Sequence, residues 1–144
     1  MDNDLGRFLE AQRYNYDNAL AEIKSGRKNG HWMWYIFPQI KGLGYSETSQ
    51  YYAINDMKEA KNYLSHPILG TRLTEISNEL LKLEQSDANL IFGGIDSMKL
   101  KSCMTLFWAA DKENAEIFIK VIDKFFVGQF DDRTLSLIKS LDEM

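Results

Sequence analysis

The sequence contains very little cysteine, histidine and proline. Cys103 is the single cysteine in 144 residues, so no disulfide can form within the chain, and a reducing compartment such as the cytoplasm is expected. One cysteine and two histidines are too few soft ligands for a zinc site, and we expect neither a metal nor a cofactor. At this length a domain buries enough surface to fold without such cross-links.

A basic surplus and long apolar runs are also missing. The net charge is −4, whereas a dedicated nucleic-acid-binding domain normally concentrates positive charge on one face, so no nucleic-acid partner is expected. No window approaches the ~20 apolar residues that span a membrane. The N-terminal sequence MDNDLGRFLEAQRY is acidic and has no apolar run of signal-peptide length. We therefore expect a cytoplasmic protein with no membrane partner, and the sequence leaves a protein partner undefined.

The apolar residues that are present recur mostly at intervals of three and four, which is the period of a helix. The sequence has two prolines that could interrupt a helix, Pro38 and Pro67. The pattern predicts an all-α fold, with a single compact domain over residues 1–144 and six or seven helices. Residues 32–37 are the one run that could also form a strand.

Residues that cap or end helices mark the expected boundaries. Asn3 or Asp4 should cap a first helix over about residues 4–25. Ser46 and Asn55 should each cap a short helix. Pro67 should open a helix that runs to about Leu83. After the glycines within residues 86–97, Asp96 or Ser97 should cap the next helix. Gly128 should end the helix before it, and Asp131 or Asp132 should cap the last helix.

Five segments, in this order, resemble the domain-of-unknown-function family 1810. They read GRKNGHWMWYIFPQIKGLGYS, YYAI, EAKNYLSHPILGTRL, IFGGIDSMKLKSCMTLF and FFVGQFDDRTL. The resemblance extends over nearly the whole chain, and it implies a small, compact, single-domain and mostly helical protein of bacterial-type cytoplasm. It implies no catalytic residue and no ligand.

The stretch most informative about function is GRKNGHWMWYIFPQIKGLG, residues 26–44. Six consecutive apolar or aromatic residues follow its histidine, and they cannot all face the same way. We expect some of the rings to enter the core and others, drawn from Trp32, Trp34 and Tyr35, to line a cleft with His31 at its entrance. The alternative is that all of them fill the core and that His31 is a structural histidine.

Cations from two segments are expected to surround this cleft. Arg27 and Lys28 follow the first helix, where they either complement its dipole or clamp an anion. Lys99 and Lys101 lie near a helix start, which is unfavourable for a cation unless an anionic partner compensates, and Lys99, Ser102 and Asp96 could share a face with that partner. The alternative is a pair of exposed surface lysines. The expected rim consists of Arg27, Lys28, Lys99 and Lys101, with Ser102 beside them.

These features predict a pocket for a small anionic, nucleotide-like metabolite, which aromatic rings and cations would bind together. If the ligand is also hydrolysed, His31 and Glu47 are the catalytic candidates. The region also resembles NADAR-type N-glycosidases, which act on ADP-ribose derivatives, but the residues after Glu47 depart from their pattern, and no role is carried over. The alternative function is a non-catalytic protein-interaction module that uses the aromatic stretch with Tyr51 and Tyr52 as its binding surface.

Overall fold

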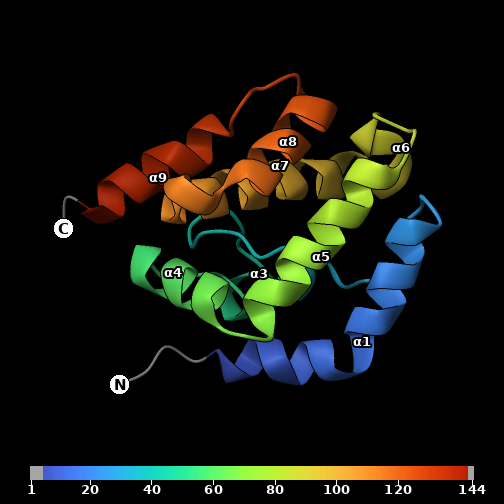
Figure 1. The fold of residues 1–144 in the computed structure, drawn as a ribbon. Helices are drawn as coiled ribbons and strands as arrows, with labels where there is room; N and C mark the ends of the chain where they lie inside the picture. The colour runs from blue at the N-terminus through green and yellow to red at the C-terminus, as the bar shows by residue number, and fades with distance from the viewer. Residues whose placement is uncertain (1–4, 143–144) are drawn as a thin grey trace.

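The computed structural model describes residues 5–142, and this part of the chain is helical and contains no strand (Figure 1). The helices are α1 (Gly6–Lys24), α2 (Met33–Ile36), α3 (Glu47–Tyr51), α4 (Met57–Ser65), α5 (Leu69–Lys82), α6 (Ala88–Phe92), α7 (Gly94–Ala110), the 3-10 helix η1 (Lys112–Asn114), α8 (Glu116–Phe126) and α9 (Asp132–Asp142). The all-α prediction is confirmed. The nine α-helices of this region exceed the expected six or seven, because α2 and α6 are short helices in segments that were not expected to form any.

Helix α7 is the centre of the packing. It contacts α4, α6, α8 and α9, while α5 packs against α1, α4 and α8. In Figure 1, α7, α8 and α9 lie together on one side, α1 lies on the opposite side, and α4 and α5 lie between them. Residues 102–107 of α7 are buried without interruption. A helix that is apolar nearly all round must be enclosed by other elements, which is the position α7 occupies. Cys103 belongs to this run and is a buried thiol, and burial raises its pKa.

Several expected boundaries are confirmed. The Ser46 hydroxyl accepts a hydrogen bond from the Ser49 N–H at 3.1 Å and caps α3. Asp131 caps α9 by accepting from the Thr134 N–H at 3.0 Å. Gly128, at φ +75°, follows the end of α8. Asn3 and Asp4, the expected caps of the first helix, lie outside the described residues.

Three other boundaries were wrong by one to three residues. The cap of α4 is Asp56, whose carboxylate accepts from the Glu59 N–H at 2.8 Å, and not Asn55. Helix α5 begins at Leu69 instead of Pro67, because the His66 Nδ1 accepts from the N–H groups of Ile68 and Leu69 and forms a turn there. Neither Asp96 nor Ser97 caps α7, which already begins at Gly94.

A buried ion pair joins the N-terminal helix to the middle of the chain. The Arg7 guanidinium contacts the Glu59 carboxylate at 2.8 Å, and the two side chains are 4% and 0% exposed. Arg7 also donates to the backbone carbonyls of Tyr51 at 2.8 Å and Ala53 at 2.7 Å. Buried charges are tolerated when their hydrogen bonds are satisfied in this way. The pair therefore holds α1, α4 and the segment between α3 and α4 in one arrangement.

No helix within residues 5–142 combines the length and the apolar character that crossing a bilayer requires.

Replacing Glu59 by leucine leaves the Arg7 guanidinium buried without its carboxylate. Removing one partner of a buried pair costs about 3–5 kcal/mol. We expect Glu59→Leu to lower the free energy of unfolding by about this amount in urea denaturation. The control is Glu116→Leu, which breaks the exposed Lys120–Glu116 pair and should change stability by only about 0.5 kcal/mol. Equal losses in the two variants would contradict the importance of the buried pair.

Candidate functional site

Glu22 organises the loop that precedes the aromatic stretch. Its Oε1 accepts hydrogen bonds from the backbone N–H groups of Asn29 at 2.6 Å and Gly30 at 2.8 Å, and from the Trp32 indole N–H at 2.9 Å. The carboxylate thus fixes the turn at the end of α1 and the direction in which the chain enters the core. The Trp32 ring is only 2% exposed, so it does not line a cleft as expected.

The aromatic stretch divides its side chains between the interior and the surface. Trp32, Met33, Ile36 and Phe37 are buried, whereas Trp34 and Tyr35 are half-buried. The stretch forms the short helix α2 and not a strand, and this helix directs adjacent side chains to different sides. The stretch therefore has both core and surface rings, as expected. Trp34 is at the surface, whereas Trp32, which was also expected to line a cleft, lies in the core.

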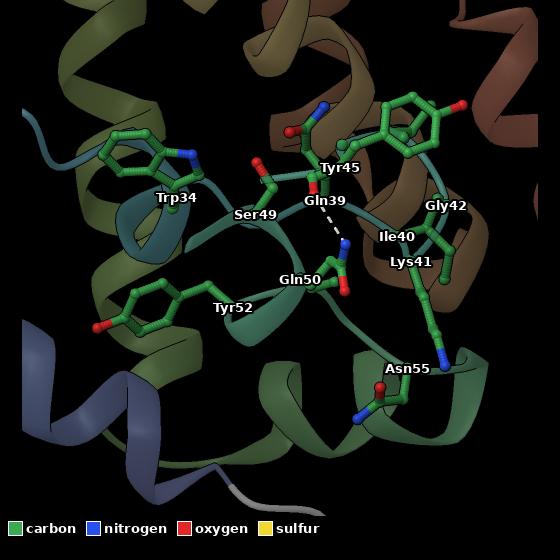
Figure 2. Close-up of a pocket in the computed structure, with 13 residues that line it drawn as sticks. Trp34, Gln39, Ile40, Lys41, Gly42, Tyr45, Ser49, Gln50, Tyr52 and Asn55 are labelled. Atoms are coloured by element: carbon green, nitrogen blue, oxygen red, sulfur yellow. Dashed lines mark hydrogen bonds between the residues drawn. The ribbon is translucent and has the colours of Figure 1, made fainter. Parts of the chain in front are cut away.

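The first hollow beside Trp34 has a volume of about 380 Å³, within the range of small-molecule sites. We call it the amide cleft, and Figure 2 shows its lining. It is formed by Trp34, by residues 39–45, and by Ser49, Gln50, Tyr52, Ala53 and Asn55. Its walls combine three aromatic rings with three side-chain amides and the Lys41 ammonium. Such walls can stack against a flat ring and donate or accept hydrogen bonds at its edge.

Backbone contacts hold the two sides of the amide cleft together. Ile40 and Ile54 form an isolated parallel bridge, in which the Lys41 N–H donates to the Ile54 carbonyl at 2.9 Å and the Ile54 N–H to the Gln39 carbonyl at 2.8 Å. Gly44 lies so close to α3 that a Cβ there would be 2.5 Å from the Ser49 Cβ. A side chain at position 44 would therefore push the cleft open.

A second hollow adjoins the first and is lined by Lys28, His31, Trp34, Asp96 and Lys99, among others. We call it the lysine hollow. Asp96 contacts the Lys28 ammonium at 2.8 Å and the Lys99 ammonium at 3.3 Å, so it is the anionic group that compensates these cations. The Lys99 Nζ also lies 4.8 Å from the centre of the Trp34 ring, a cation–π distance.

A third, connecting hollow shares residues with both neighbours. It has Gln39, Leu43, Gly44 and Ser49 in common with the amide cleft, and Ile95 and Lys99 in common with the lysine hollow. Arg133 lines it as well, and its guanidinium donates to the Tyr45 hydroxyl at 3.3 Å. The three hollows are therefore neighbours around Trp34 and Lys99, and we refer to them together as the groove.

The remaining expected site residues lie elsewhere or are already engaged. Lys28 is nearly buried in its contact with Asp96, and Arg27 is exposed. Lys101 lies over the Phe126 ring. Ser102 lines the connecting hollow, but its buried hydroxyl is hydrogen-bonded to the Thr134 hydroxyl at 2.8 Å. Glu47 is exposed on α3, and His31 lines the lysine hollow, so the catalytic candidates are not brought to a common hollow.

Sequence reasoning missed the amides and two cations of the groove. These are Gln39, Lys41, Gln50, Asn55 and Arg133. Three amides between residues 39 and 55 were the available signal, because binding residues are disproportionately found on loops. Arg133 had no such signal, since it is far from the others in sequence.

The family described as "Protein of unknown function (DUF1810)" matches residues 2–138. The chain belongs to this family. The resemblance found in the sequence is confirmed, and the groove described above is a feature of a DUF1810 protein. We found no match among curated proteins.

A solved structure supports the DUF1810 fold. The crystal structure of the conserved hypothetical protein Rv1873 from Mycobacterium tuberculosis aligns with a TM-score of 0.91 at 40% sequence identity. The alignment covers 94% of this chain and 96% of Rv1873. The arrangement of helices that creates the groove is therefore similar in the two proteins.

The Glu22 contacts predict a specific pH dependence of stability. Burial by itself raises the Glu22 pKa, but hydrogen bonds from the Gly30 and Asn29 N–H groups and from the Trp32 and Asn18 side chains outweigh it, so the pKa lies below its usual 4.5. A lowered folded-state pKa gives stabilisation that is complete above the unfolded value and lost as the pH falls through the folded value.

We therefore expect the unfolding free energy of Glu22→Gln to fall less steeply than that of the wild type between about pH 5 and about pH 3, as measured by urea denaturation. Glu84→Gln removes an exposed carboxylate and should keep the wild-type slope. The same slope in Glu22→Gln as in the wild type would rule out this role of Glu22.

Proposed function

We propose that the groove binds a small anionic, nucleotide-like metabolite. Trp34 carries this proposal, because its ring lines both the amide cleft and the lysine hollow and has the Lys99 ammonium 4.8 Å from its centre. A heterocycle in the amide cleft would meet aromatic walls, and an attached phosphate would lie near Lys99 or Arg133. The ligand would be met in the cytoplasm, where the Cys103 thiol stays reduced.

We propose binding of this ligand and not its hydrolysis. General acid–base catalysis requires its groups within hydrogen-bond reach of the reacting atoms. Glu47 is exposed on α3 and His31 lines the lysine hollow, so the two residues do not support a joint hydrolytic role.

The protein-interaction alternative receives less support. Its surface was expected to consist of the aromatic stretch with Tyr51 and Tyr52, but four of the six residues from 32 to 37 are buried. Trp34 and Tyr52 are accessible inside a concave cleft, and not on a flat patch of the kind that anchors a protein partner.

A thermal-shift panel of nucleotides and ADP-ribose derivatives tests the proposal. A ligand at a hundred times its Kd adds about 2.7 kcal/mol, which raises Tm by several degrees. We expect at least one ligand to stabilise the wild type and to lose its effect in Trp34→Ala. Trp108→Ala is the matched control, since Trp108 is half-buried against Phe130 and lies outside the groove. The absence of any shift, or equal shifts in wild type and Trp34→Ala, would remove the basis of the proposal.

Two lysines on α7 provide a test of the anion contact. Lys99→Met should weaken binding about tenfold and reduce its salt dependence, because a charge-assisted contact near Trp34 is lost. Lys101→Met makes the same change in charge beside Phe126 and should leave affinity near the wild-type value. Isothermal titration at two salt concentrations measures both effects. Equal weakening by the two variants would indicate a general electrostatic effect and not a site at Lys99.

A further inference from the structure

Two exposed amide side chains in the cleft each direct their nitrogen to an acceptor of the protein. The Gln50 Nε2 donates to the Tyr45 backbone carbonyl at 2.8 Å, the contact drawn as a dashed line in Figure 2. The Asn55 Nδ2 donates to the Glu59 Oε1 at 3.3 Å, and the Asn55 N–H donates to the same oxygen at 2.9 Å. A carbonyl and the carboxylate paired with Arg7 can only accept hydrogen bonds. Neither amide can therefore rotate by 180° without placing two acceptors against each other.

This orientation leaves two acceptor oxygens for a ligand, the Gln50 Oε1 and the Asn55 Oδ1. Both residues line the amide cleft, and among residues 5–142 no side chain or backbone group donates to either oxygen. Figure 2 shows Gln50, Asn55 and Lys41 away from the rings of Trp34 and Tyr52, which lie together on another side of the cleft. A flat ligand stacked on those rings would present its edge to the two oxygens.

We infer that the amide cleft selects heterocycles that carry an exocyclic amino group over their keto counterparts, an inference that rests on the proposed binding of a nucleotide-like ligand. An amino group has two hydrogens and can donate to both the Gln50 and the Asn55 oxygen, whereas the keto edge offers one ring N–H to one of them and sets its own oxygen against the other. Adenine and cytosine have the favoured edge. Hypoxanthine and uracil have the disfavoured one.

Matched nucleotide pairs test this selectivity, because AMP and IMP, like CMP and UMP, share the ribose phosphate and differ in the amino or keto group. We expect AMP to bind about three- to tenfold more tightly than IMP in isothermal titration, and CMP more tightly than UMP, which is the range of one or two exposed hydrogen bonds. Equal or tighter binding of IMP would overturn the inference and would point to the Lys41 ammonium as a donor to the keto oxygen.

Substitutions of Gln50 and Asn55 test whether these two residues produce the selectivity for AMP over IMP. Gln50→Leu and, separately, Asn55→Ala should each bring the AMP-to-IMP ratio towards one, because AMP loses a hydrogen bond and the keto oxygen of IMP loses an opposing acceptor. A helical far-UV circular dichroism spectrum shows that each variant is folded. Gln129→Leu removes an exposed glutamine outside the cleft and should keep the wild-type ratio. An unchanged ratio in both cleft variants would overturn the assignment to these oxygens.

The outcomes also separate this inference from the function on which it rests. If AMP and IMP bind equally and both lose affinity in Trp34→Ala, the groove binds nucleotides without selecting the amino group, and only the inference fails. If neither these four nucleotides nor any other ligand of the thermal-shift panel binds the wild type, the proposed function fails as well.

Discussion

The buried contact between Arg7 and Glu59 is the constraint on which the candidate site depends. It places a cation of α1 against a carboxylate of α4, and Arg7 also binds the carbonyls of Tyr51 and Ala53 on one edge of the amide cleft. The same Glu59 oxygen accepts hydrogen bonds from Asn55. One carboxylate thus balances a buried charge and orients an amide that lines the cleft, so the geometry of the site is tied to the stability of the fold.

A second carboxylate decides how much positive charge the groove retains. Asp96 contacts both Lys28 and Lys99, and Lys28 is nearly buried in this contact. The wide cationic rim expected from the sequence is therefore reduced, because Lys28 and Lys99 share one carboxylate. Lys41 lines the amide cleft, and Arg133 lines the connecting hollow together with Asp131. A rim of separated cations suits a ligand with a single anionic group better than a polyanion, since a polyanion needs a continuous positive surface.

Most of the fold could be predicted because helix periodicity and capping act within one or two turns. The spacing of apolar residues located every long helix, and Ser46 and Asp131 were identified as caps. One error arose where two neighbouring polar residues could both cap a helix. Asn55 was predicted to cap α4, but the side chain that accepts from the Glu59 N–H is the carboxylate of Asp56. Of the residues predicted for a site, Trp34, His31 and Lys99 line the candidate groove, whereas Trp32 is buried with its indole N–H bound to Glu22, ten residues away.

The sequence by itself determined the helical class and the presence of aromatic residues that the core could not fully enclose, because both follow from local spacing. Only the tertiary structure decided which ring faces the groove, which lysine is neutralised and which amide oxygens remain as acceptors. These outcomes depend on contacts between segments far apart in the chain, such as Lys28 with Asp96 and Arg7 with Glu59. No periodic pattern records such pairs, since the chain must fold before the partners meet.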